Sequence, residues 1–387
     1  MDPALLSNTD AVAKALTPLA NVPFVTIDTE FMRETTYWPK LCLVQLAGPD
    51  GTPVLIDPLA DGVSLDPLFE LLNNPDVVKV FHAARQDIEI FFHMAGRVPA
   101  PIFDTQVAAA VCGFGEAVGY EAIVAKLAKT QIDKGQRFTD WSRRPLNPRQ
   151  IAYAAADVIH LVDVYLALHD DLDARGRRSW MDADMAILTS PDTYDMRPEE
   201  AWRRVKSRLR GGRDLAILME VAAWREREAQ SRDVPRNRIV KDDVINDVAQ
   251  NKPETQDALG QLRSIPKGYE RSDAGAALVE IVREVMARPK SDLPKPLKHD
   301  RRAPAPPALT DLLKALLKHV ADESGVAARI IATTSDIEAI ASDDDADVPA
   351  LNGWRHEVFG DKALKLKRGD LAFAYEDGRL VVEPRRR

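Results

Sequence analysis

The segment DTEFMRETTYWPKLCLVQL, residues 28–46, decides the fold of the N-terminal part of the chain. It extends a strand-like pattern that starts at Phe24, and it ends in a second apolar run over Leu41–Ala47. A third short run covers Val54–Asp57, after the turn-forming stretch GPDG at 48–51. Apolar runs separated by such a turn predict neighbouring antiparallel strands.

Strand and helix patterns alternate through the rest of the first half. Val77–Phe81 is typical of a strand, and Ala84–Met94 is typical of a helix. Asn147 is a good helix cap and Pro148 suits the first turn, so a long helix is expected to begin there. This alternation predicts an α/β domain, with a mixed sheet flanked by helices. Strand patterns largely stop after about residue 190, so we expect the later part to be helical.

Composition limits the class of protein. The 387 residues are 45% hydrophobic and 29% charged, which leaves room for two or three domains. The net charge of −8 excludes a uniformly basic surface for nucleic acid. Cys42 and Cys112 are the only cysteines, which indicates a reducing compartment. The sequence shows no signal peptide and no apolar run near the roughly 20 residues of a membrane span, so we expect a cytoplasmic protein without membrane contact.

Four acidic residues and one tyrosine are the candidates for chemistry. Asp28 and Glu30 lie two apart on a predicted strand and therefore share a face. Asp87 lies early in a predicted helix, and Tyr153 and Asp157 share a face of the long helix as an i, i+4 pair.

Each of these acidic positions, taken alone, also has a structural explanation. A strand end can be solvated, an acid near a helix N-terminus is favourable, and a core tyrosine can neighbour an exposed aspartate. Four carboxylates at one place, however, repel each other unless cations lie between them. Oxygen ligands alone indicate Mg²⁺ or Mn²⁺ rather than zinc. Two such ions can hold the attacking and leaving oxygens of a phosphodiester, so we expect a site with two divalent metal ions.

Three motifs match a known family. The segment 28–46, the sequence HAARQD at 82–87 and the sequence YAAAD at 153–157 resemble the three motifs of the DEDD superfamily of 3′→5′ exonucleases. The first is similar to the signature of the ribonuclease D family. One branch of the superfamily has a histidine five positions before the last aspartate, where this chain has Ala152. The chain therefore resembles the tyrosine branch, which implies an RNase H-like sheet flanked by helices.

The resemblance also implies a role for each position. Asp28, Glu30 and Asp157 would bind the metal ion that activates water, and Asp28 would also bridge to the second ion. Asp87 would support the second ion, and Tyr153 would orient the attacking water.

The C-terminal half has a basic segment with aromatic residues. Between residues 197 and 240 there are twelve Lys or Arg and seven Asp or Glu, a local net charge of +5. Basic residues interleaved with tryptophans indicate phosphate binding and base stacking, although a helical bundle with core tryptophans and solvated arginines gives the same pattern. The predicted RNA contacts are Trp202, Arg203 and Arg225, together with Phe31 and Met32, which match base-contacting positions in relatives.

Four segments are predicted in order. Residues 1–195 would form the exonuclease domain, and 196–290 resembles an HRDC domain, a small helical nucleic-acid-binding module. Residues 291–307 form a proline-rich linker, and 308–387 resembles a second, more divergent HRDC domain, so both of these domains are expected to be helical. A β-like pattern is present in its tail, LAFAYEDGRLVVEP.

The activity implied is that of a 3′→5′ exoribonuclease that trims the 3′ ends of tRNA precursors and other small structured RNAs. It would release nucleoside 5′-monophosphates, and three domains in one chain are expected to act as a monomer. A DNA 3′→5′ exonuclease shares the same acids and is one alternative. A non-catalytic RNA-binding scaffold is another, but such a protein usually has lost a ligand residue, and none is lost here.

Overall fold

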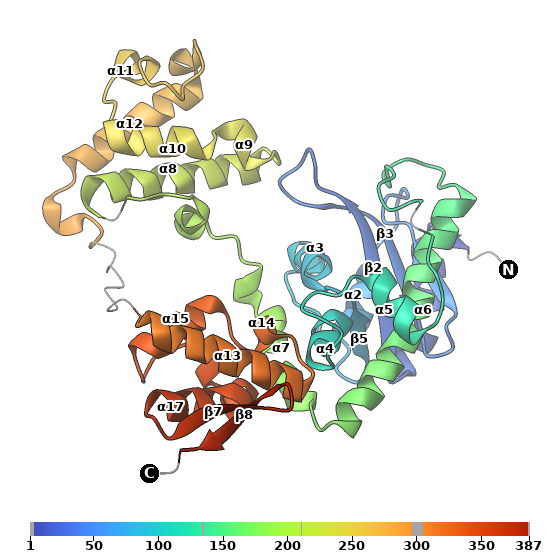
Figure 1. The fold of residues 1–387 in the computed structure, drawn as a ribbon. Helices are drawn as coiled ribbons and strands as arrows, with labels where there is room; N and C mark the ends of the chain where they lie inside the picture. Colours follow the sequence, from blue (N-terminus) through green and yellow to red (C-terminus); the bar gives the residue numbers. More distant parts are fainter. Residues whose placement is uncertain (1–3, 134, 210, 296–304, 386–387) are drawn as a thin grey trace. The chain divides into compact units, whose positions relative to one another are not determined.

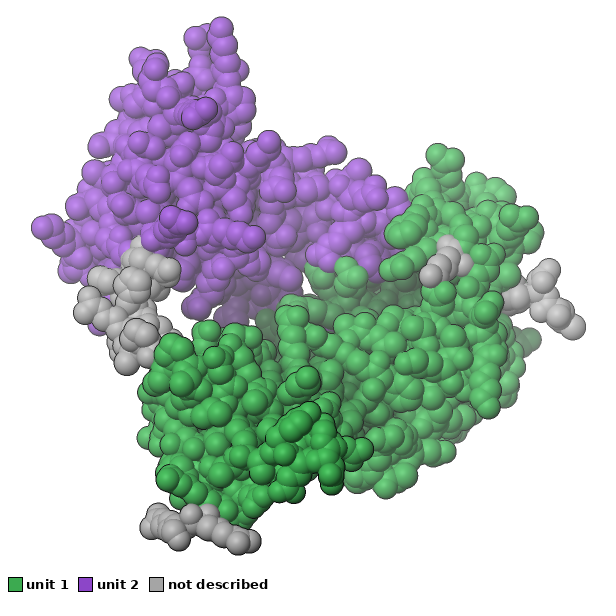
Figure 2. Space-filling model, viewed as in Figure 1, with its two compact units in different colours: residues 1–30, 41–193, 301–387 green, residues 31–40, 194–300 purple. Residues whose placement is uncertain are grey.

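A computed structural model of the protein describes residues 4–133, 135–209, 211–295 and 305–385. The chain divides into two compact units, which Figure 2 shows in separate colours. The first comprises residues 1–30, 41–193 and 301–387, and the second comprises residues 31–40 and 194–300. The two are described separately below.

The first unit is built on a six-stranded sheet with the order β1-β4-β3-β2-β5-β6. Figure 1 labels three of these strands, β3, β2 and β5. The strands β3 and β4 are antiparallel, as predicted, whereas β4 pairs with β1, β5 with β2, and β6 with β5 in parallel. The sheet is therefore mixed, as the sequence predicted. The elements up to the start of the helical half are β1 (Leu5–Leu6), α1 (Thr9–Leu16), β2 (Phe24–Met32), β3 (Lys40–Ala47), β4 (Pro53–Ile56), α2 (Asp66–Leu72), β5 (Val78–Phe81), α3 (Arg85–Ala95), β6 (Ile102–Asp104), α4 (Thr105–Val111), α5 (Tyr120–Leu127), α6 (Pro148–Ala174) and α7 (Asp182–Thr189).

The long helix α6 is fixed at its start by its own sequence. The side chain of Asn147 accepts a hydrogen bond from the backbone N–H of Gln150, and the Gln150 side chain accepts one from the backbone N–H of Asn147. This capping box satisfies two amide groups that a helix otherwise leaves without partners. The helix packs on β4 and β5 of the sheet. By length and composition α6 could cross a membrane, but half of its most apolar stretch is buried inside the protein, as in a core helix.

The C-terminal segment shares a hydrophobic core with the sheet-bearing part of the first unit. Val158 and Leu161 of α6 belong to the same buried cluster as Leu313 and Phe359. The hairpin of β7 and β8 pairs in antiparallel register, as the β-like pattern of the tail indicated, so this helical segment ends in a small sheet. Its elements are α13 (Pro307–Ser324), α14 (Ala328–Ile331), α15 (Thr334–Ser342), α16 (Gly353–Arg355), the π-helix η8 (His356–Gly360), α17 (Asp361–Lys367), β7 (Leu371–Glu376) and β8 (Arg379–Pro384).

Aromatic and polar contacts also join the C-terminal segment to the sheet-bearing part of the first unit. The rings of Trp180 and Trp354 are stacked with centroids 4.2 Å apart. The guanidinium of Arg177 donates to the backbone carbonyls of Val111 and Ser324, at 2.8 and 2.6 Å. A segment far along the chain is thus tied to the helix that ends at Val111.

The second unit is helical and encloses its own core. Leu215 and Leu218 of α8, Ile245 of α10 and Leu278 of α12 are buried together. Its helices are η4 (Pro198–Arg204), α8 (Gly212–Ser231), α9 (Arg236–Ile239), α10 (Asp242–Asn251), α11 (Gln256–Gly260) and α12 (Asp273–Ala287).

The segment from the end of β2 to the first residue of β3, residues 31–40, belongs to this second unit. The Tyr37 hydroxyl donates to the carboxylate of Glu226, whose side chain is fully buried in α8. The same hydroxyl accepts a hydrogen bond of 2.9 Å from Arg236. The backbone N–H groups of Tyr37 and Trp38 both donate to Asp233, each at 3.0 Å. The chain that follows Glu30 is therefore held by the helical unit.

The bounds of the four predicted segments remain a prediction. In space, residues 301–387 group with the sheet, and residues 31–40 group with the helices. A 3-10 turn, Lys290–Asp292, begins one residue before the predicted linker. The helix α13 begins at Pro307, the last residue of that linker. Residues 296–304 of the linker, and the last two arginines of the tail, lie outside the described residues.

Candidate active site

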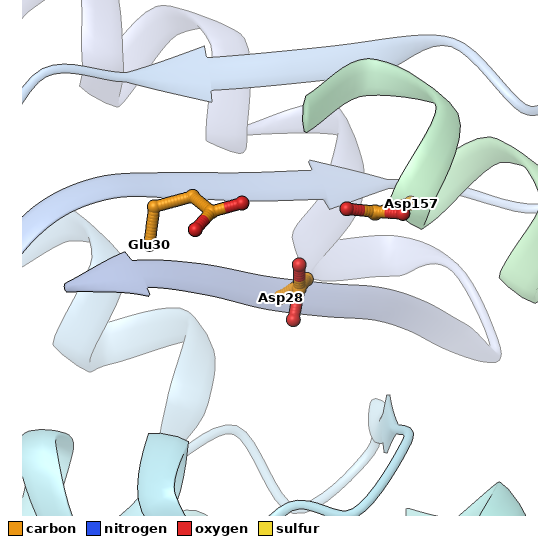
Figure 3. A group of neighbouring side chains, drawn as sticks. All are labelled: Asp28, Glu30 and Asp157. Carbon is orange, nitrogen blue, oxygen red and sulfur yellow. The ribbon is translucent and has the colours of Figure 1, made fainter. Parts of the chain in front are cut away.

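Three of the predicted carboxylates lie together. Asp28 and Glu30 extend from β2, and Asp157 extends from α6, as Figure 3 shows. One oxygen of each lies within 4.8 Å of the others. The period of two along the strand and the position of the helix against the sheet produce this arrangement. The three side chains are in the range that one cation can span.

Burial and mutual repulsion favour the neutral form of these acids. Burial raises the pKa of Asp28 to about 6. Burial and the charge of Asp28 raise the pKa of Asp157 to about 8, and burial and the charges of Asp28, Asp157 and Asp87 raise that of Glu30 to about 10. Carboxylates placed so close are unfavourable without a positive charge between them. An oxygen-only donor set of this kind fits Mg²⁺ or Mn²⁺.

Asp87 lies next to this group rather than within it. It is buried near the start of α3, and its carboxylate accepts a hydrogen bond from the hydroxyl of Thr29, the residue between Asp28 and Glu30. Burial and the charge of Asp28 raise the pKa of Asp87 well above its usual value. Asp87 lies in the first turn of α3, where the helix dipole also favours an acid, so its role at the site stays a prediction.

Tyr153 lies on the same face of α6 as Asp157, as the i, i+4 spacing predicted. Burial and the charges of Asp157, Glu30 and Asp28 raise the pKa of the Tyr153 hydroxyl. Its ring lies beside the buried ring of Trp141, with centroids 6.0 Å apart. A hydroxyl that stays protonated beside three acids can donate a hydrogen bond but is not suited to act as a base.

A cavity of about 390 Å³ opens beside the acids. Asp28, Tyr153 and Asp157 line it, together with residues that the sequence analysis did not select: His82, Ala83, Gln106, Gly119, Tyr120, Glu121, Ala122, Ile132, Arg137 and Leu161. The volume is within the range of small-ligand pockets.

Two of these additional residues have defined partners. The Tyr120 hydroxyl donates to the backbone carbonyl of Asp157 and so fixes α6 at the position of the acid. His82 contacts the hydroxyl of Thr105 at 2.9 Å and the carbonyl of Val118 at 3.0 Å, so both ring nitrogens are engaged. His82 could have been selected from the sequence, because it is the first residue of the motif HAARQD. No local pattern indicated Tyr120.

The five predicted RNA contacts are in the second unit and differ in exposure. Phe31 and Met32 end β2 and are half-buried. The guanidinium of Arg203 lies 5.3 Å from the ring centre of Trp202 and is paired with Glu200. Trp202 is half-buried and packs on the helical core.

Arg225 was predicted to contact RNA, but the structure places it in the interior of the helical unit. Its side chain is buried, and its guanidinium donates to Asp242 at 2.6 Å and to the carbonyl of Val240 at 3.2 Å. A buried arginine with these partners joins two helices and does not face a phosphate. Other charges of the basic segment are paired as well, since Arg204 and Arg236 both contact Glu226.

Comparison with known proteins assigns the chain to a family. Residues 3–173 match the 3′-5′ exonuclease family, and residues 214–282 match the HRDC domain. A protein named Ribonuclease D from Nitrobacter hamburgensis is 53% identical over 97% of this chain and 98% of its own length. The chain belongs to the ribonuclease D family. A ribonuclease D from Bartonella henselae is 46% identical over 97% of this chain and 93% of its own.

A solved structure supports the ribonuclease D fold over most of the chain. The crystal structure of Escherichia coli RNase D, described as an exoribonuclease involved in structured RNA processing, aligns with a TM-score of 0.83 at 29% identity. The match covers 95% of this chain and 99% of that one. The predicted fold class is therefore confirmed, and so is the identification as a 3′→5′ exoribonuclease.

Proposed function

We propose that this exoribonuclease removes single nucleotides from the 3′ ends of tRNA precursors and other small structured RNAs, with two divalent metal ions, Mg²⁺ or Mn²⁺. The observation that carries the proposal is the group formed by Asp28, Glu30 and Asp157, with oxygens within 4.8 Å of one another. The exonuclease family is metal-dependent, and this group is the acidic cluster that such chemistry requires. The products would be nucleoside 5′-monophosphates.

The proposed roles follow from where each side chain lies. Asp28, Glu30 and Asp157 would hold the metal, with Asp28 shared between the two ions and Asp87 beside the second. When bound, the metal ions lower the pKa of a water and stabilise the leaving 3′ oxygen. Tyr153, which keeps its proton, would donate to that water and hold it in line with the phosphorus. The cavity beside the acids would take the terminal nucleotide.

Substrate contacts outside the cavity are proposed for four residues. Phe31 and Met32 would contact the last bases, because they directly follow Glu30 on β2. Trp202 and Arg203 would contact RNA farther from the end, since Arg203 is exposed. Arg225 is left out because it is buried. We further propose that the protein acts as a monomer in the cytoplasm, without contact with a membrane.

A trimming assay tests the proposal. A tRNA transcript with a 3′ extension, labelled at its 5′ end, is incubated with the protein and Mg²⁺ or Mn²⁺. We expect a ladder that shortens from the 3′ end and disappears with EDTA or with Asp28→Asn. Asp170→Asn is the matched control, because Asp170 lies on the same helix as Asp157 and is 86% exposed. Trimming that persists in Asp28→Asn would overturn the site, and faster degradation of single-stranded DNA than of RNA would favour the DNA alternative.

A further inference from the structure

The loop that precedes α6 carries an unusually exposed aromatic side chain at the edge of the active-site cavity. Phe138 is 92% exposed, the most exposed of the large hydrophobic side chains in the described part of the chain. A single exposed phenylalanine is common on protein surfaces. Its neighbour Arg137, however, lines the cavity that also contains Asp28 and Asp157. The position of Phe138, and not its exposure alone, is therefore informative.

The backbone around Phe138 is fixed although its ring is exposed. The backbone N–H of Thr139 donates to the carbonyl of Gln136 at 3.1 Å, which closes a turn around Arg137 and Phe138. The Thr139 hydroxyl accepts a hydrogen bond of 3.1 Å from the buried Gln150, the residue that closes the capping box of α6. The turn is thus attached to the helix that carries Tyr153 and Asp157. The exposed ring of Phe138 therefore projects from a backbone that is held by hydrogen bonds.

Arg137 supplies positive charge where the cavity is acidic. It is the only lysine or arginine among the described residues that line the cavity, whereas Asp28, Glu121 and Asp157 are acids. Its guanidinium lies 5.3 Å from the ring centre of Phe138, so the cation and the aromatic face are adjacent. An aromatic face next to a cation is the combination that binds a base together with its phosphate in single-stranded nucleic acids.

We propose that Arg137 and Phe138 form an entrance site for the single-stranded 3′ end, in which Phe138 stacks on one RNA base and Arg137 binds the adjoining phosphate. Stacking on an aromatic ring accepts any base, which suits an enzyme that removes nucleotides one after another. This inference rests on the proposed RNA-trimming function. It adds two positioning residues that bring the end of the RNA to the acids.

The test combines protein variants with abasic RNA. A labelled oligoribonucleotide is made with one abasic residue at each position near the 3′ end in turn. On intact RNA, Phe138→Ala should lower kcat/KM roughly 5- to 160-fold, the range expected from losing one stacked base, mainly through KM. On the RNA whose abasic position matches the site, the same substitution should have no further effect. Phe138→Trp should retain activity, whereas Phe138→Leu, which is apolar but has no aromatic face, should behave like Phe138→Ala.

Controls separate this inference from the proposed function. Tyr375→Ala removes a matched aromatic side chain, 75% exposed on the C-terminal hairpin, and should change nothing. Arg137→Gln should lower the slope of log affinity against log salt by about 0.7, the value for one phosphate contact on a single strand, and Arg137→Lys should restore it. If the wild type trims RNA but Phe138→Ala is within twofold of it, or loses the same factor on every abasic RNA, the entrance site is wrong and the proposed function stands.

A binding measurement covers the case in which the wild type trims no RNA. In the Asp28→Asn background, 2-aminopurine near the 3′ end should be quenched on binding, and Phe138→Ala should restore its fluorescence. Unchanged quenching in Phe138→Ala would contradict the stacking.

Discussion

Binding of a divalent metal ion should release about two protons near pH 7, because metal binding requires ionised carboxylates. The pKa of Glu30 is raised to about 10 and that of Asp157 to about 8, by burial and by neighbouring acids. Burial raises that of Asp28 to about 6. At pH 7 the first two groups are therefore largely protonated, and Asp28 is largely ionised. The apparent metal affinity should then rise about 100-fold per pH unit around pH 7, and about tenfold per unit between pH 8 and 10.

Titration calorimetry with Mn²⁺ checks this number. The heat is measured at pH 7 in two buffers of different ionisation enthalpy, and the difference gives the number of protons released. Glu30→Gln should release at least one proton fewer, because Glu30 carries a full proton at this pH. Asp170→Asn, an exposed position on the same helix, should release as many as the wild type. A heat that is independent of the buffer, or an affinity that is equal at pH 6 and pH 8, would refute the reasoning.

Three further predictions concern stability. Tyr37→Phe removes a hydrogen bond to the buried charge of Glu226, so the free energy of unfolding of the helical unit should fall by about 1.5–3 kcal/mol in urea; a change below about 0.5 kcal/mol, the usual effect of a neutral surface substitution, would contradict it. Burial raises the pKa of Asp57, but hydrogen bonds and the charge of Arg144 lower it by more, so the pKa is below its usual value. The stability it contributes is present above the ordinary pKa of about 4 and is lost as the pH falls through the lower, folded value; Asp57→Asn should therefore flatten the dependence of Tm on pH below pH 4, and an unchanged slope would count against this. Gly113→Ala should lower Tm, because its φ of +92° disfavours a side chain and the new Cβ would lie 2.2 Å from a carbonyl oxygen of the C-terminal segment; an unchanged Tm would show that the contact relaxes.

The sequence predicted the features that depend on local spacing. A period of two placed Asp28 and Glu30 on one face, and the i, i+4 rule did the same for Tyr153 and Asp157. The start of α6 followed from Asn147 and its proline neighbour. These are contacts between residues close in the chain, where backbone geometry alone decides which side chains meet.

Contacts between distant residues were beyond local patterns. Nothing near Tyr37 indicates that it meets Glu226, which lies 189 positions later. Arg225 has the charge of a phosphate contact, and only the folded structure shows that it is buried and paired with Asp242. In the same way, Tyr120 has no local sign of its contact with the backbone of α6. Such residues are identified by packing, which a single sequence does not display.

The C-terminal segment illustrates how packing changes the interpretation of a predicted domain. Its leucines and phenylalanines enter the same buried cluster as the inner face of α6, the helix that carries Asp157. The close approach of Gly113 to the carbonyl of Gly325 and the two backbone contacts of Arg177 join it to the end of α4. Burial of apolar surface is the main source of stability, and the C-terminal segment and α6 contribute to one buried cluster. The described C-terminal residues thus belong to the core on which the helix that carries Asp157 is built, and they do not form a separate domain with a core of their own.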